Sequence, residues 1–110
     1  MDTKVVRKDA ARLFMDGPEV CREYAVTDKI LFGSSTLLPG QTGAVDPGHP
    51  VSKEIFFVSR GQVIMHTPDD GKYYELGEGD IIVIPEGKPH RLSNIGTEVA
   101  VITWSLAPTP

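Results

Sequence analysis

The stretch that decides the fold is Gly79-Asp80-Ile81-Ile82-Val83-Ile84-Pro85-Glu86-Gly87-Lys88-Pro89-His90-Arg91-Leu92-Ser93-Asn94. It contains an apolar strand at residues 81–84, a turn at 85–87 and a second strand that begins at His90. Proline fixes the φ angle of the turn, and glycine is favoured at the end of a type I turn. A histidine placed directly after such a turn is positioned by the backbone, as a binding site requires.

Short apolar segments separated by turn signals make up most of the rest of the chain. The predicted strands cover residues 30–38, 54–58, 63–67, 73–76, 81–84, 90–93 and 99–106. Residues 41–52 are rich in glycine and proline and are predicted to form a loop. Residues 8–15 fit a helical turn or a short strand at a sheet edge, with the strand favoured, and residues 20–26 show a mixed pattern. Many short strands without a convincing helix predict an all-β sandwich or barrel.

Length and charge narrow the functional class. A chain of 110 residues is expected to form one domain with one modest core. Its net charge of -4 argues against nucleic acid as a partner, since nucleic-acid binding requires a basic face. The single cysteine, Cys21, excludes an internal disulfide. The N-terminal residues are charged and lack a long apolar run, so we expect a cytoplasmic protein with no membrane partner.

The spacing of the deciding stretch is also that of a known motif. Written as G-x5-P-x-G-x2-H-x3-N, it matches at every defined position the second signature motif of the cupin family. The matching residues are Gly79, Pro85, Gly87, His90 and Asn94. The chain therefore resembles a small single-domain cupin.

The first cupin motif, G-x5-H-x-H-x3/4-E-x6-G, is matched only in part. Glu54 and Gly61 keep the spacing between glutamate and glycine, and His49 occupies the position of the second histidine. Pro47 stands where the first histidine belongs, so that ligand is absent.

The resemblance implies a fold and a site. It implies a double-stranded β-helix, the cupin jelly-roll barrel, over about residues 30–106, with residues 1–29 as a covering or dimer-contact element. It also implies that His49, Glu54 and His90 converge. Two imidazoles and one carboxylate form a ligand set that Fe, Mn, Ni or Zn would accept. The alternative is a cupin that has lost its metal.

Three other polar residues remain open as contributors to this site. Asp46 and Gln41 lie near the gap left by Pro47 and could ligate a metal or bind substrate. His66 is a possible replacement ligand. Strand alternation, with Val63 and Met65 as core positions, points its side chain away from the barrel.

The ligand set and the cupin resemblance together imply a metal-dependent enzyme acting on a small oxygenated metabolite, of the dioxygenase, isomerase, decarboxylase or lyase type found among similar cupins. Glu54 would serve as the general base if it does not bind the metal. The alternative is a non-catalytic module that binds or senses a small molecule.

Two predicted strands, residues 55–58 and 81–84, are apolar at every position. A strand with one face in water should alternate, so both faces of these strands are expected to be covered. One face fills the barrel. The other needs either the N-terminal segment or a second copy of the chain, and a homodimer is predicted.

Overall fold

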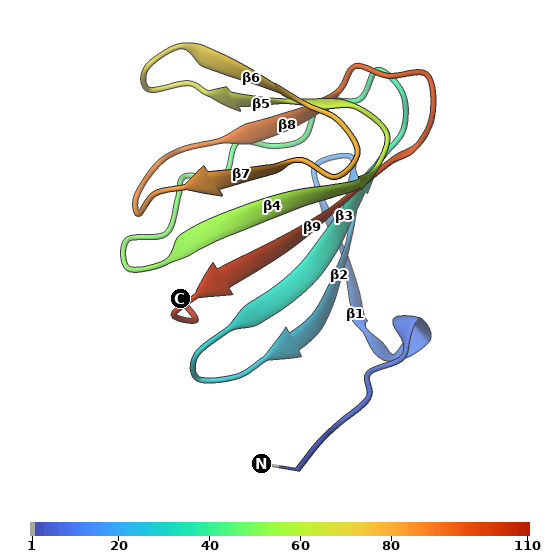
Figure 1. The fold of residues 1–110 in the computed structure, drawn as a ribbon, viewed down its shortest axis with the longest axis vertical. Coiled ribbons are helices and arrows are strands. Elements are labelled where there is room, and N and C mark those ends of the chain that lie inside the picture. Colours follow the sequence, from blue (N-terminus) through green and yellow to red (C-terminus); the bar gives the residue numbers. More distant parts are fainter. Residues whose placement is uncertain (1) are drawn as a thin grey trace.

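The computed structural model describes residues 2–110 as nine strands and one short 3-10 turn (Figure 1). The elements are η1 (Lys8–Ala10), β1 (Arg12–Asp16), β2 (Glu19–Val26), β3 (Leu31–Leu37), β4 (Lys53–Arg60), β5 (Val63–Thr67), β6 (Lys72–Leu76), β7 (Ile81–Ile84), β8 (Arg91–Asn94) and β9 (Ala100–Ala107). They form a six-stranded sheet in the order β1-β2-β3-β9-β4-β7 and a three-stranded sheet in the order β6-β5-β8. All strand pairs are antiparallel, and the fold is the all-β double-stranded β-helix that the cupin resemblance implied.

The predicted strands lie within one or two residues of the observed ones, except at the N-terminus. Residues 8–15 contain both elements that the sequence allowed, the η1 turn and then the start of β1. The mixed segment 20–26 is the long strand β2, which pairs with β1 on one side and β3 on the other. Among residues 2–110, no helix is long and apolar enough to cross a membrane.

Strand alternation places the core between the two sheets. Along β4, buried residues alternate with exposed ones, so Glu54, Phe56 and Val58 point inward while Ile55 and Phe57 point outward. The opposite sheet contributes inward residues from β5 and β8. Because Glu54 shares the inner face with two apolar core residues, its carboxylate is carried into the barrel.

The outer faces of β4 and β7 remain uncovered within one chain. Ile55 pairs with Val83 and Phe57 with Ile81, and these side chains are 40–53% exposed. The N-terminal strands do not cover them, because β1 and β2 extend the opposite edge of the same sheet (Figure 1). The expectation that the N-terminal segment could cover this face is therefore wrong for residues 2–29.

Candidate metal centre

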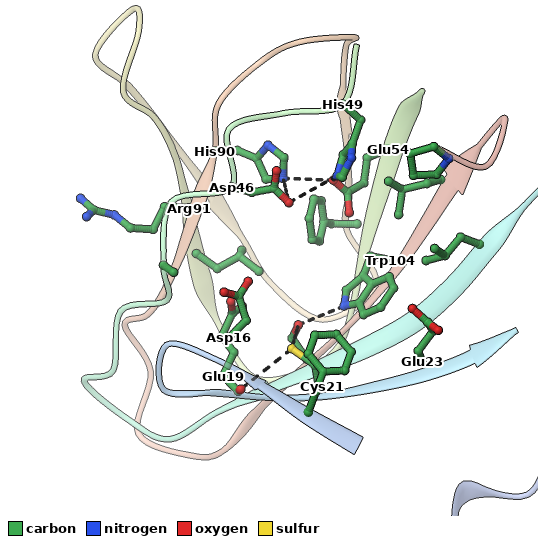
Figure 2. A pocket seen from close by; sticks show the side chains of 18 residues that line it. Asp16, Glu19, Cys21, Glu23, Asp46, His49, Glu54, His90, Arg91 and Trp104 are labelled. Atoms are coloured by element: carbon green, nitrogen blue, oxygen red, sulfur yellow. Dashed lines mark hydrogen bonds and ion pairs between the residues drawn. The ribbon is translucent and has the colours of Figure 1, made fainter. Parts of the chain in front are cut away.

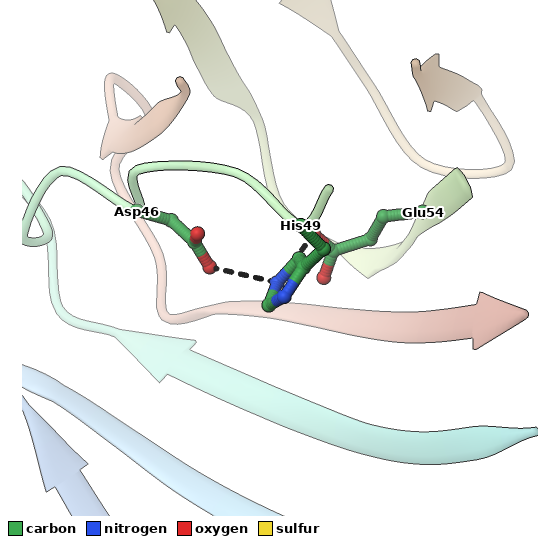
Figure 3. A group of neighbouring side chains, drawn as sticks. All are labelled: Asp46, His49 and Glu54. Carbon is green, nitrogen blue, oxygen red and sulfur yellow. Dashed lines mark ion pairs between the residues drawn. The ribbon is translucent and has the colours of Figure 1, made fainter. Parts of the chain in front are cut away.

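Four side chains converge at one end of the barrel interior (Figure 2), and Figure 3 shows three of them, Asp46, His49 and Glu54, alone. Asp46, His49 and Glu54 each offer one ligand atom, and these atoms lie within 4.8 Å of one another. His90 adds its Nε2 atom, 3.0 Å from Glu54 Oε1 and 3.7 Å from Asp46 Oδ2. His49 Nε2 lies 3.4 Å from Asp46 Oδ2 and 3.8 Å from Glu54 Oε1. The three ligands that the cupin resemblance implied are thus brought together, and Asp46 joins them.

The backbone fixes Asp46 and His90 against each other. Each donates its N–H to the other's carbonyl oxygen, at 2.8 and 3.0 Å, which forms an isolated antiparallel bridge. Asp46 Oδ1 accepts a hydrogen bond of 2.8 Å from the Gly48 N–H. That bond holds the carboxylate so that its other oxygen, Oδ2, is the atom next to both imidazoles.

The loop carrying His49 is tied to the turn that precedes His90. The Gly87 N–H donates to the His49 carbonyl oxygen at 2.9 Å, and Gly48 packs directly against the Gly87–Lys88 peptide. Gly48 has φ +93°, and a Cβ atom there would lie 2.7 Å from the Gly87 carbonyl carbon. Only glycine satisfies both the backbone conformation and this close approach.

We expect Gly48→Ala to weaken metal binding as well as folding. The added methyl group must push the His49 loop away from the Gly87 turn, and the four ligands come from these two segments and β4. We expect the free energy of unfolding to fall by about 1–3 kcal/mol and metal affinity to fall at least about tenfold. Urea unfolding and competition with a fluorescent chelator measure the two effects.

Gly79→Ala is the matched control for this prediction. Gly79 also has a positive φ, +86°, but no atom lies within 4 Å of the position of its Cβ. It should lose stability from backbone strain alone and keep full metal affinity. Equal metal affinity in the two variants would contradict the role assigned to the Gly48 contact.

The backbone carbonyl of Lys88 fixes the orientation of the His90 ring. Its Nδ1 atom lies 2.8 Å from the Lys88 carbonyl oxygen, which can only accept, so Nδ1 carries a proton. Its Nε2 atom therefore faces Glu54 with a free lone pair when the ring is neutral. Burial lowers the pKa of His90, but contacts with Glu54, the Lys88 carbonyl and the charge of Asp46 outweigh it, so the net pKa is raised.

The donor atoms fit a divalent metal ion. Ligands bound at about 2.1 Å and separated by about 90–110° lie roughly 3.0–3.4 Å apart. The neighbouring donor pairs here lie 3.0–3.8 Å apart. Glu54 Oε1 and His90 Nε2 are buried and have no hydrogen-bond partner among residues 2–110. Buried polar atoms without partners are costly unless a bound group satisfies them.

The four side chains open onto a cavity of about 200 Å³. Its wall is largely apolar and includes Phe56, which packs edge-on against the His90 ring with 5.4 Å between centroids. Trp104 forms another part of the wall and donates its Nε1–H to Ser35 Oγ at 3.0 Å. A cavity of about 150 Å³ holds a benzene molecule, so the space admits one small ring.

The two other candidates from the sequence, His66 and Gln41, lie outside the group of four side chains. His66 stacks on Tyr73, with 4.3 Å between ring centroids, and does not line the cavity, as strand alternation predicted. The Gln41 side chain accepts a hydrogen bond of 2.9 Å from the Leu38 N–H at a turn. Arg91 lies next to His90 in sequence, yet its guanidinium points away from the centre of the site (Figure 2).

Sequence reasoning missed the cavity residues of β2. Glu19 and Cys21 are buried and line the cavity, as does Glu23 on the same strand. Their alternation i, i+2, i+4 is the signal of one strand face. That signal was obscured because this face carries carboxyl and thiol groups rather than apolar side chains.

Comparisons with known proteins agree with this geometry. The model of the cupin domain family matches residues 33–106. An uncharacterized protein, MJ1618 of Methanocaldococcus jannaschii, is 38% identical over 48 residues. That match covers 44% of this chain and only 37% of the relative's length.

Solved structures show the same fold at low sequence identity. A conserved double-stranded β-helix protein from Klebsiella pneumoniae has a TM-score of 0.82 and 22% identity, covering 98% of this chain and 92% of that one. The polyketide cyclase RemF from Streptomyces resistomycificus has a TM-score of 0.77 and 17% identity, covering 97% and 80%. Strand order, the convergence of the site residues at one end of the barrel and the family match together lead to one conclusion: the chain belongs to the cupin domain family.

Proposed function

We propose that this chain is a metal-dependent cupin enzyme acting on a small molecule, with Asp46, His49, Glu54 and His90 as the metal ligands. One observation carries the proposal. Glu54 Oε1 and His90 Nε2 face each other across 3.0 Å in a buried site, and neither has a hydrogen-bond partner among the residues described. Two further donor atoms stand beside them.

The chemistry follows from this donor set. A divalent Fe, Mn, Ni or Zn ion bound there would supply Lewis-acid polarisation of a substrate oxygen or, for iron, oxygen chemistry. The Lys88 carbonyl keeps the His90 ring oriented for ligation, as outer hydrogen bonds do in metal sites. The apolar part of the wall, which includes Phe56 and Trp104, would pack against the substrate. If Glu54 does not bind the metal, its carboxylate is placed to take a proton from substrate instead.

An enzymatic role is also supported by the structural neighbourhood, which includes the polyketide cyclase RemF.

Metal content of protein purified without chelator and without a nickel column tests the proposal directly. We expect close to one ion per chain, and oxygen uptake with catechols or diketones after iron loading if the chain is a dioxygenase. Protein that takes up none of the four metals would overturn the proposal and favour a module that only binds or senses a small molecule.

We also propose that two copies of the chain pair through the outer faces of β4 and β7. Ile55, Phe57, Ile81 and Val83 form a contiguous stripe that remains 40–53% exposed in one chain. Apolar clusters of this kind mark interaction sites. Two-fold pairing places the same stripe on both partners and buries it against itself.

We expect Phe57→Lys to weaken this dimer at least about tenfold, because the substitution buries a charge in the interface. Ile95→Lys is the control, since Ile95 is similarly exposed (47%) but follows β8 in the other sheet. Light scattering across a concentration series measures the dissociation constant. A wild-type protein that is monomeric at micromolar concentration would refute the pairing.

A further inference from the structure

A second polar group faces the cavity away from the four ligands. Glu19, on β2, is only 7% exposed and lines the cavity. Figure 2 shows it beside Asp16 and apart from the group formed by Asp46, His49, Glu54 and His90. Its carboxyl group is confined by Gly43, where a Cβ atom would lie 2.7 Å from the Glu19 Cδ atom.

The surroundings of Glu19 favour a protonated carboxyl group near neutrality. Burial is the main reason, and the charges of Asp16 and Asp46 add to it. His90 and the Ser35 hydroxyl act in the opposite direction. The balance raises the pKa of Glu19 to about 7. Glu23, the next carboxylate along the same face, is instead paired with Arg12 at 3.1 Å.

The charge of the cavity wall around Glu19 disfavours a negatively charged group at that end of a substrate. Five acidic side chains line it, whereas Arg91 is the one lysine or arginine among its lining residues. The Arg91 guanidinium lies on the far side of β8, where Nη2 approaches His66 Nδ1 at 3.5 Å. Away from the four proposed metal ligands, no described lysine or arginine faces the cavity, so a carboxylate at the Glu19 end of a substrate would meet acids and no cation.

We propose that Glu19 contacts the substrate as a proton-exchanging group, and that the substrate is a neutral, hydroxyl-bearing molecule about the size of one ring. This rests on the proposed function, since the other end of the substrate lies at the metal centre. When the substrate hydroxyl is deprotonated, its O–H bond breaks, the electron pair stays on the substrate oxygen, and an O–H bond forms on the Glu19 carboxylate. In the reverse direction the protonated carboxyl returns that proton.

The first test observes the Glu19 carboxyl group itself. Protein labelled with ¹³C at the glutamate side-chain carboxyl carbons is titrated by NMR, and the Glu19 signal is the one lost in Glu19→Gln. We expect it to titrate close to pH 7, and titration in the ordinary range near 4.5 would overturn the proposal. The measurement uses metal-free protein, so it stands even if the protein binds no metal.

The second test measures ligand choice on metal-free protein, where no bound metal ion can attract the anion, with catechol as the neutral probe and benzoate as the anionic one. We expect calorimetry to show catechol binding at least about tenfold more tightly than benzoate. Glu19→Leu should weaken catechol binding about tenfold, while Glu75→Gln, at an exposed site on β6, should not change it. Benzoate binding as tightly as catechol, or no effect of Glu19→Leu, would refute the assignment.

Metal content separates this inference from the proposed function. Glu19→Gln should hold as much zinc as the wild type, because Glu19 is not a ligand. Loss of zinc in this variant alone would overturn the inference and make Glu19 part of the metal centre. A wild type that takes up none of iron, manganese, nickel and zinc would refute the metal-dependent function and leave the carboxyl titration as the measure of Glu19.

Discussion

His90→Ala is expected to abolish stoichiometric metal binding. The substitution removes the most buried of the four proposed ligands, 3% exposed, and leaves Glu54 Oε1 without the Nε2 atom that lies 3.0 Å away. Loss of an outer hydrogen bond alone typically costs 10–100-fold in metal affinity, so we expect loss of a ligand to cost at least about 100-fold. Elemental analysis and chelator competition measure the effect.

Two controls define what this loss means. His66→Ala removes the histidine that stacks on Tyr73 outside the cavity and should retain full metal content. Asp46→Asn should weaken binding if Asp46 supplies the ligand missing at Pro47, while Asp16→Asn should not. Retention of metal by His90→Ala, with loss in His66→Ala, would show that the site lies on the outer face of β5.

Glu19→Gln should make the protein more stable at pH 8 than the wild type, and by about 3 kcal/mol. The folded protein raises the pKa of Glu19 from 4.5 to about 7, so between these values the folded state holds a proton that the unfolded chain has released. Stability contributed by this proton is present below pH 4.5 and is lost as the pH rises to about 7. The shift is worth about 3 kcal/mol at 1.4 kcal/mol per pKa unit.

Urea unfolding at several pH values between 4.5 and 8 measures this difference. Glutamine resembles the protonated carboxyl group, so the two proteins should be about equally stable near pH 4.5 and diverge above it. Glu75→Gln is the matched control because it removes an exposed charge, and its difference from the wild type should not change with pH. A constant difference for Glu19→Gln would show that Glu19 is ionised in the folded protein throughout this range.

Much of the fold could be predicted from the local sequence, because strands, turns and the alternation of side chains are short-range properties. The strand at residues 81–84 was predicted with its observed bounds, and Gly87 has the positive φ of +71° that the turn requires. The inward direction of Val63 and Met65, and therefore the outward direction of His66, also followed from alternation. Strand β2 was missed because its inner face is a cavity wall, where carboxyl and thiol groups replace the apolar residues that mark a strand.

By itself, the sequence determined the strands from β3 to β9, the turn before His90 and, through the motif, the family and three of the four converging side chains. Only the tertiary structure decided that Asp46 joins them, because the bridge between Asp46 and His90 links segments 44 residues apart. The tertiary structure also decided that Glu19 lies across the cavity from these four side chains. Burial, charge and hydrogen bonding at a site depend on what packs around each group, and those neighbours come from distant parts of the chain.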